Sequence, residues 1–564
     1  MPAIPIDQKQ PWWDPRSARA WATFAFALLL VLRVVRAFTL APDTDEAQHL
    51  HVVWAWTQGL VVYRDVFDNH TPLFHLLCAP LLMLLGERAD VVLWARLAMI
   101  PLYFGALYAT WRIGRDLWSS RVGVYAALLA GATPVFFNTS AQFRTDDLWM
   151  LLWLCTVAAA LVRPFTTLRA FLVGVLAGAT FCVSAKTTLL LGTALLAVAT
   201  VFVLDRRRLA LRPKLWAECA AAGLAGALLI PAAFAVYFIA HDAWRQALYA
   251  IFEHNVVADL GRWKHGAWYF WLFPVGYALA IAAARHWRSR AKPSRWRRGS
   301  VVLLSAIGYL LALFAYWPLF THQDLLPVLP LIALLPAALL AEGGGHRAAP
   351  MRFALRYVPL ALAFGALAIG VLGSPDRYAP SKDELARILS LSRPGEYVMD
   401  PKGESIFRRR PFFWVIERVT EQRLRDGSIR DDLPQRLEAT STALLVDDHL
   451  PAADRAFVEA NYLSLDGWLR IAGRHLGPLA AGKGVDFDVA IASDYRFVDR
   501  HGGVPGWLDG DRFVDGPVHL AAGGHRFAPL AAGDVALVWA PALERGVSLQ
   551  SLLSTVERGA TASR

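Results

Sequence analysis

The sequence has few charged residues and few cysteines. Charged residues make up 18% and hydrophobic residues 56% of the 564 residues, whereas about 25% of the residues of a typical soluble domain are charged. This composition excludes an ordinary soluble protein and indicates an integral membrane protein. All 4 cysteines lie in the hydrophobic part of the chain, so we expect no disulfide framework. The sequence also lacks a Walker-type Gly-Lys-Ser/Thr motif, so we expect no nucleotide-binding loop.

Eleven segments are apolar and of a length suited to membrane-spanning helices, which need about 20 residues. They are 21–40, 91–111, 122–137, 148–162, 170–185, 187–204, 216–240, 267–284, 301–320, 325–341 and 353–373. A shorter apolar stretch, 72–86, predicts a juxtamembrane or re-entrant helix.

The distribution of basic residues indicates the orientation. The net charge of +11 arises largely from short loops between apolar segments, which favours a topology signal over nucleic-acid binding. With the N-terminus inside, the inner loops hold 23 Lys and Arg and the outer loops 7. We therefore predict a protein of a bacterial inner or plasma membrane with a cytoplasmic N-terminus and an extracytoplasmic C-terminal domain.

The first outer loop carries adjacent acids, Asp45 and Glu46. A carboxylate that is partly desolvated at a membrane surface has its pKa raised toward the working range of a general base. The alternative is a helix cap, with Asp43 or Thr44 at the N-cap and acids in the first turn. Composition alone favours the cap.

A second acidic cluster, which includes Asp146, opens another predicted span on the same face. Basic residues and histidines lie at other outer span ends, namely Lys186, Lys264, His265 and His322. Together these groups predict a polar pocket for a phosphate-bearing lipid, because Lys and His bind phosphate through charge-assisted hydrogen bonds. Taken singly, each one is more typical of an interfacial anchor.

The order of several short motifs resembles a known superfamily. The motifs are Asp45-Glu46-Ala47, Asn69-His70-Thr71-Pro72-Leu73, Arg96 in the second span, Gly114-Arg115, Arg144-Thr145-Asp146, Lys186 after the fifth span, and His322 before the run Leu325 to Pro330. In this order the chain resembles the GT-C polyprenyl-phosphate-sugar-dependent glycosyltransferases, which include the protein O-mannosyltransferases (glycosyltransferase family 39) and the lipid A aminoarabinose transferase.

The resemblance implies a mainly α, polytopic GT-C fold with about eleven transmembrane helices, juxtamembrane helices and a C-terminal extracytoplasmic domain. It implies that Asp45 is the catalytic base, with Glu46 beside it and Asp146 in the same site. It also suggests that Lys186 and His322 contact the donor phosphate. With the residues of the other motifs and the outer span ends, the predicted substrate- and phosphate-binding set is His70, Arg96, Arg144, Lys186, Lys264, His265 and His322. The family has Lys-Pro where this chain has His70-Thr71.

The implied reaction transfers a sugar, with inversion, from a polyprenyl-phosphate donor to a hydroxyl of a protein, lipid or glycan acceptor. The implied partners are that donor, the acceptor and membrane lipids, and no nucleic acid. We assign no cofactor and no metal with certainty. A divalent cation stays open, because acidic residues and His49 and His51 are ligand types that such cations use. The alternative function is a polytopic lipid or solute transporter, or flippase, which predicts ionisable residues near the middle of the membrane.

From Ser374 the sequence turns polar, and we predict three domains. Residues 1–373 form the transmembrane catalytic domain, 374–490 an α/β domain, and 491–564 a small β module and tail. Residues 382–391 predict a helix, and 397–400 and 443–447 predict buried strands that end in acids. Asp509-Gly510 and Asp515-Gly516 predict turns. The basic stretch 402–410 is interpreted as solvated or resting on lipid headgroups.

Overall fold

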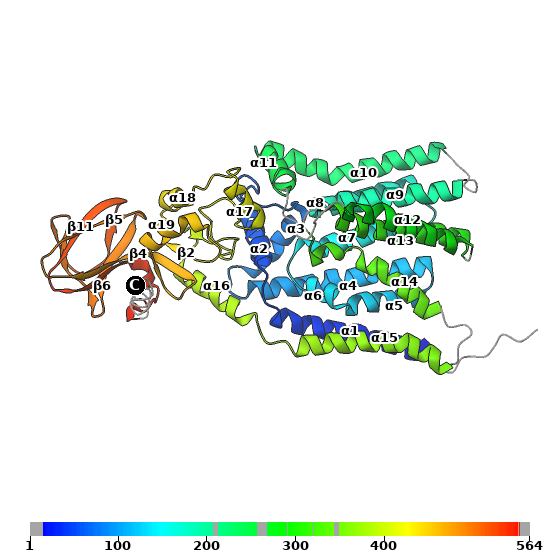
Figure 1. The fold of residues 1–564 in the computed structure, drawn as a ribbon, viewed down its shortest axis with the longest axis horizontal. Coiled ribbons are helices and arrows are strands. Elements are labelled where there is room, and N and C mark those ends of the chain that lie inside the picture. Colours follow the sequence, from blue (N-terminus) through cyan, green and yellow to red (C-terminus); the bar gives the residue numbers. More distant parts are fainter. Residues whose placement is uncertain are drawn as a thin grey trace, which may run out of the picture.

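The structure, a computed structural model, describes residues 15–206, 213–256, 268–289, 291–317, 320–342, 349–550 and 552. In these residues the chain forms a bundle of long helices and a C-terminal domain at one end of the bundle (Figure 1). The mainly helical fold with a C-terminal α/β and β region is therefore confirmed.

Each of the eleven apolar segments contains a helix in the described part of the chain. These helices are α1 (Pro15–Thr39), α4 (Val91–Leu117), α5 (Ser120–Ala132), α7 (Thr145–Leu161), α8 (Thr167–Val183), α9 (Thr187–Asp205), α10 (Pro213–Ala240), α12 (Leu272–Arg288), α13 (Pro293–Tyr316), α14 (Leu329–Glu342) and α15 (Ala349–Leu372). Among the described residues, five helices are long and apolar enough to cross a membrane, namely α1, α4, α9, α10 and α13. The protein is thus a membrane protein by composition and fold, and the number of crossings stays a prediction.

Short helices lie between the long ones. They are α2 (Thr44–Thr57), α3 (Leu73–Leu85), α6 (Pro134–Thr139), α11 (Trp244–Leu248), η2 (Tyr249–Glu253), η3 (Trp268–Trp271) and η4 (His322–Leu325). Helices α2 and α3 lie at the end of the bundle that faces the C-terminal domain (Figure 1). Helix α3 exposes Leu77, Met83 and Leu84, an apolar surface that suits the predicted juxtamembrane position.

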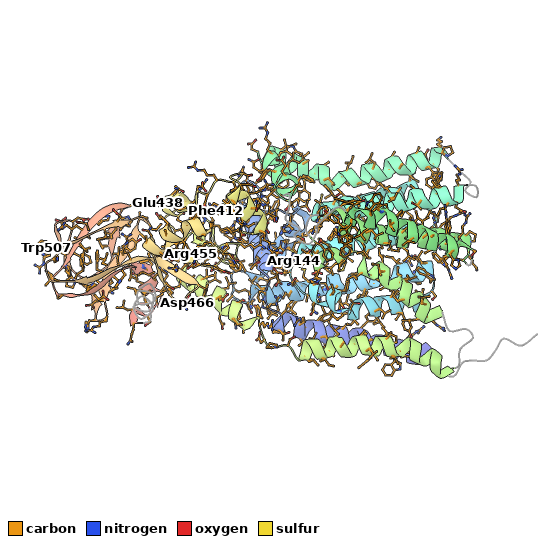
Figure 2. All side chains as sticks on the ribbon, viewed as in Figure 1. Arg144, Phe412, Glu438, Arg455, Asp466 and Trp507 are labelled. Atoms are coloured by element: carbon orange, nitrogen blue, oxygen red, sulfur yellow. The ribbon has the colours of Figure 1, made fainter. Side chains whose placement is uncertain are left out.

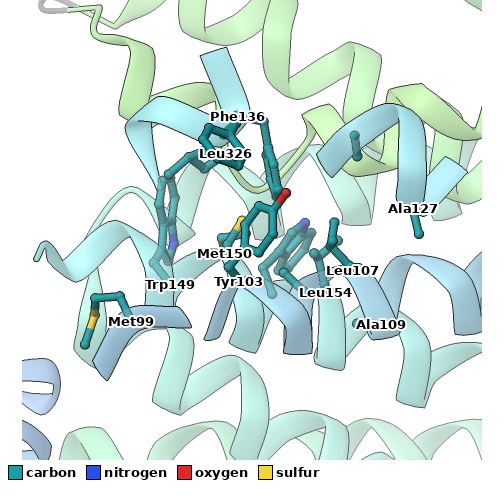
Figure 3. Close-up of a cluster of buried hydrophobic side chains, with 14 of the residues drawn as sticks. Met99, Tyr103, Leu107, Ala109, Ala127, Phe136, Trp149, Met150, Leu154 and Leu326 are labelled. Carbon is teal, nitrogen blue, oxygen red and sulfur yellow. The ribbon is translucent and has the colours of Figure 1, made fainter. Parts of the chain in front are cut away.

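The bundle has a continuous hydrophobic core of interlocking aromatic and aliphatic side chains (Figure 3). Trp149 and Met150 of α7 lie there with Tyr103 of α4. The indole of Trp149 donates a hydrogen bond to the Thr187 hydroxyl at 2.9 Å, so this large side chain is buried without an unpaired polar group. The bond also ties the start of α7 to the start of α9.

Helices α8 and α10 pack through glycines. A Cβ atom at Gly174 would lie 2.0 Å from the Gly223 carbonyl oxygen, and one at Gly226 would lie 2.1 Å from the Phe171 carbonyl oxygen. No side chain fits at these distances, so the two backbones approach closely because both positions are glycine. This is the small-residue packing common between membrane helices.

The C-terminal domain contains short helices and two sheets. The helices are α16 (Ala379–Leu391), α17 (Arg418–Arg425), α18 (Leu433–Ala439), η5 (Ala452–Asp454), α19 (Arg455–Asn461) and α20 (Ala540–Glu544). The strands are β1 (Val398–Met399), β2 (Leu444–Val446), β3 (Tyr462–Ser464), β4 (Leu469–Leu479), β5 (Val485–Val489), β6 (Ser493–Asp499), β7 (Gly502–Gly503), β8 (Gly506–Leu508), β9 (Asp511–Phe513), β10 (Val518–Leu520), β11 (Gly523–Pro529) and β12 (Gly533–Trp539). The predicted helix at 382–391 and the two predicted buried strands are therefore present.

The larger sheet has eight strands in the order β1-β2-β4-β12-β6-β10, with β3 on β4 and β7 on β6. The smaller sheet has the order β5-β11-β8-β9. Phe497 of β6 stacks on Phe527 of β11 with ring centroids 3.8 Å apart, which joins the two sheets through one core. We expected a domain boundary at residue 490. Strand β4 lies before this residue and β12 after it, and the two strands pair, so 374–490 and 491–564 share one sheet.

The predicted turns have different outcomes. Asp509-Gly510 connects β8 to β9, which pair as an antiparallel hairpin. Asp515-Gly516 does not close a hairpin, because β10 pairs with β6 instead of β9. The Asp515 carboxylate receives a bidentate ion pair from Arg496 of β6, at 2.7 and 2.9 Å.

Candidate active site

Helix α2 begins in the first loop with a complete capping box. The side chain of Asp43 accepts a hydrogen bond from the Asp45 backbone N–H at 3.0 Å, and Glu46 accepts one from the Asp43 N–H at 3.1 Å. The predicted helix cap is therefore confirmed. Because Asp43 and Glu46 supply the cap, the Asp45 carboxylate is left to face the interface between the bundle and the C-terminal domain.

Glu46 and Arg96 form a buried ion pair and do not face this interface. Glu46 is 0% and Arg96 1% exposed, and they meet at 2.8 and 2.5 Å. Arg96 also donates to the carbonyls of Ala37, Leu40 and Ala41, and Glu46 also accepts from the Phe143 N–H at 2.7 Å. These contacts occupy the hydrogen-bonding groups of both side chains. The prediction that Arg96 binds phosphate is therefore not supported, and Glu46 is placed as a positioning residue.

Two cations contact Asp45. The Arg144 guanidinium lies 2.5 Å from one carboxylate oxygen, and the Lys402 ammonium contacts the other. Burial alone would raise the pKa of Asp45, but the charges of Arg144 and Lys402 lower it far below its usual range. The expectation of a raised pKa is therefore wrong, because two cations contact this acid and one of them, Lys402, comes from the distant C-terminal domain.

Arg144 joins the acids of the first loop to those at the start of α7. It lies at the boundary between the bundle and the C-terminal domain (Figure 2). Its guanidinium is 3.3 Å from Asp146 and 3.4 Å from Asp43, in addition to Asp45. The structure thus brings Asp45, Arg144 and Asp146 together, as predicted from their shared sidedness.

Lys186 lies at the start of α9 and pairs with Asp324 of η4. Asp324 is fully buried, and its backbone carbonyl accepts a hydrogen bond from Tyr309 at 3.0 Å. The charge of Asp146 also acts on Lys186, so this ion pair lies near the acids and the cation at the start of α7. His322 begins η4 beside this pair and is exposed, while Lys264 and His265 lie outside the described residues.

His70, whose side chain is 28% exposed, lies in a group of polar side chains whose other members, Asp68, His75 and His49, are buried. Its Nδ1 is 3.0 Å from Asp68, and the Nδ1 of His75 is 3.3 Å from the other oxygen of Asp68. The ring of His49 lies 3.0 Å from His75. Burial alone lowers the pKa of His70, but the hydrogen bond and charge of Asp68, with a contribution from Asp45, raise the pKa above its ordinary value. Asp68 and Asp45 therefore favour the protonated form of His70.

The C-terminal domain contributes residues that the sequence analysis missed. Most of the stretch 402–410 is not a solvated surface. Arg409 is exposed, but Arg408 is 1% exposed and forms a bidentate ion pair with Glu87 at 2.7 and 2.8 Å. Arg410 contacts the buried Asp400 at 2.9 Å. The interpretation as a lipid-facing stretch is therefore wrong, because these cations meet acids on the bundle and within their own domain. No local sequence signal identifies Lys402, since its partner lies more than 350 residues earlier.

No group of three or more His, Cys, Asp and Glu side chains in the described part of the chain is arranged to hold a metal ion. The residues that gather here are instead an alternation of acids and cations. Lys and Arg keep further N–H donors when one is paired with an acid, so the cations of this cluster suit a phosphate-bearing ligand.

Comparisons with known proteins identify the fold. Residues 69–230 match the family model of the dolichyl-phosphate-mannose-protein mannosyltransferases. The apo structure of ArnT from Cupriavidus metallidurans is similar with a TM-score of 0.58 and 14% identity, covering 81% of this chain and 98% of that chain. The same protein bound to undecaprenyl phosphate has a TM-score of 0.55 and 15% identity, with the same coverage. The search of curated proteins found no match.

A weaker likeness, with a TM-score of 0.46 and 17% identity, is to the arabinofuranosyltransferase AftD from Mycobacteria, covering 92% of this chain and 40% of that chain. The similarity to ArnT establishes the architecture: this chain has the GT-C fold. The GT-C resemblance stated from the motif order is thereby confirmed at the level of fold. Fold alone does not assign an activity, so the activity is argued from the site.

Proposed function

We propose that this protein is a membrane glycosyltransferase that moves a sugar from a polyprenyl-phosphate donor to an acceptor hydroxyl on the extracytoplasmic face, with inversion. The observation that carries the proposal is the cluster at one end of the bundle, where Arg144 contacts both Asp45 and Asp146 and the ion pair of Lys186 with Asp324 lies within reach of the charge of Asp146. An acid beside several cations is what a base and an anionic leaving group require. The bound undecaprenyl phosphate of the similar ArnT supports this class of donor.

In the proposed reaction Asp45 accepts the proton of the acceptor hydroxyl. The acceptor oxygen forms a bond to the anomeric carbon while the bond from that carbon to the phosphate oxygen breaks. The polyprenyl phosphate leaves as an anion, and Arg144, Lys186 and protonated His70 stabilise its charge. Attack opposite the leaving group inverts the anomeric configuration.

The buried Arg33 of α1 does not support the transporter alternative. Arg33 is 2% exposed, and its guanidinium donates to the Phe137 carbonyl at 2.6 Å and to the Ser140 hydroxyl at 3.1 Å. A transport pathway would place such a charge in a water-filled cavity. Arg33 instead fastens α1 to the segment of α6.

The test is turnover of purified protein with a panel of polyprenyl-phosphate sugars, following release of free polyprenyl phosphate. Asp45→Asn removes the base and keeps the size of the side chain, so we expect release to fall by about 100-fold or more. Thermal unfolding of the variant gives the control for folding. Near-normal turnover in Asp45→Asn, or no release by the wild type from any donor, contradicts the proposal.

A further inference from the structure

The C-terminal domain supplies one cation of the site. The Lys402 ammonium contacts Asp45 and lies 3.4 Å from the Thr44 hydroxyl and 3.9 Å from Glu417. Its side chain is only 12% exposed, whereas most lysines point into solvent. Lys402 therefore reaches away from its own domain into the cluster of the bundle.

The loop around this lysine is built to hold it in place. The Asp400 carboxylate accepts hydrogen bonds from the Ser405 N–H at 3.0 Å and from the Gly403 N–H. Gly403 has a φ of +105°, and a Cβ there would lie 2.9 Å from the Cβ of His51 in α2. Glycine is therefore required both for the turn and for close packing on α2. The His51 ring also meets the Ile406 carbonyl at 3.0 Å.

The domain has other contacts that keep it docked. Arg408 pairs with Glu87 at the start of the second span, and Asn69 donates to Glu417 at 2.8 Å. These contacts do not involve Asp45. The contact between Lys402 and Asp45 can therefore break while the domain stays on the bundle.

Lys186, Arg144 and Lys402 differ in the acids that they contact. Lys186 is paired with the buried Asp324. Arg144 contacts Asp146 and Asp43 as well as Asp45, so it is held in place by several acids. Lys402 has Asp45 as its nearest partner, and an ammonium on a flexible stem changes partners more readily than a planar guanidinium.

We propose that Lys402 is a further ligand for the donor phosphate, and that it moves from Asp45 to the phosphate when the lipid-linked donor binds. The inference rests on the proposed function and adds to it a residue from the C-terminal domain. The exchange leaves one oxygen of Asp45 free for the acceptor hydroxyl. Loss of this cation also raises the pKa of Asp45 toward the range of a general base, so the base becomes active only in the presence of donor.

Binding of undecaprenyl phosphate to the full-length protein in nanodiscs tests the inference, with undecaprenol as the uncharged comparison. We expect Lys402→Gln to weaken binding of the phosphate by about tenfold or more, because one charge-assisted contact is lost. Lys402→Arg should retain most of the affinity. Affinity for undecaprenol should be equal in all variants.

Two further variants separate binding from docking. Lys483→Gln removes an exposed lysine of the C-terminal domain and should bind the phosphate as the wild type does. Glu87→Gln weakens the docking contact of Arg408 and should lower the affinity less than Lys402→Gln does. Equal affinity of Lys402→Gln and wild type, or an equal loss in Glu87→Gln, overturns the inference. Failure of the wild type to prefer undecaprenyl phosphate over undecaprenol overturns the proposed function itself.

The pH profile gives a second readout. In free Lys402→Gln the carboxylate of Asp45 has lost one neighbouring cation, so its pKa is higher. The acid limb of kcat/KM should therefore move to higher pH than in the wild type. An unchanged acid limb would show that Lys402 does not act on Asp45 in the free protein and would overturn the inference, because the proposed exchange begins from this ion pair.

Discussion

Glu46→Gln distinguishes a structural acid from a catalytic one. Glu46 and Arg96 are both buried and bind each other in two hydrogen bonds. Replacing Glu46 by the neutral amide leaves the Arg96 charge buried without an anion. Removing one partner of a buried ion pair costs about 3–5 kcal/mol of stability. The cost is smaller here because Arg96 still donates hydrogen bonds to backbone carbonyls. We expect a loss of about 2–4 kcal/mol of stability.

The assay is thermal unfolding of purified protein followed by intrinsic fluorescence, with turnover measured well below the midpoint. We expect a lower midpoint for Glu46→Gln and a turnover per folded molecule within about tenfold of wild type, since Glu46 is fully buried against Arg96. Arg96→Met combined with Glu46→Gln should recover part of the stability, because no unpaired charge then remains. An unchanged midpoint together with lost turnover would refute the structural assignment of Glu46.

Two further predictions concern the charge of His70 and the packing of α8 on α10. His70 is positively charged below its raised pKa, so the affinity for undecaprenyl phosphate should fall as the pH rises through that pKa. His70→Lys should retain the affinity at higher pH. A wild-type affinity that does not change with pH would exclude this role. Gly174→Ala places a methyl 2.0 Å from the Gly223 carbonyl oxygen and should lower the stability by about 1–3 kcal/mol or more. Gly192→Ala is the matched control, because no atom lies within 4 Å of a Cβ added at Gly192, and it should leave the unfolding midpoint unchanged or higher. Equal midpoints for the two variants would contradict the close packing of α8 on α10.

The length and apolar composition of the segments were sufficient to predict the helices of the bundle. The physical reason is local: in lipid, a single apolar segment satisfies the hydrogen bonds of its own backbone N–H and C=O groups by forming a helix. Capping signals are local too, and the Asp43 to Glu46 capping box could be predicted because its members are three residues apart. The buried strands at 398–399 and 444–446 followed from short apolar runs in the same way.

Motif order placed Asp45, Arg144, Asp146 and Lys186 on one side of the membrane, and their shared position at one end of the bundle agrees with that prediction. Sidedness follows from counting spans, so residues far apart in sequence can be assigned to one face. It does not say which acid meets which cation. Glu46 and Asp45 are neighbours in sequence, yet one is buried against Arg96 and the other faces the interface.

Only the tertiary structure decided what the C-terminal domain contributes. Lys402 reaches Asp45 because the turn at Asp400, the close approach at Gly403 and the pair of Arg408 with Glu87 dock the domain on α2. The shift in the pKa of Asp45 likewise depends on cations from two distant segments. Sequence determined the helices, their caps and their common face through local physics, whereas the partners and charges within the site depend on long-range contacts that no local pattern encodes.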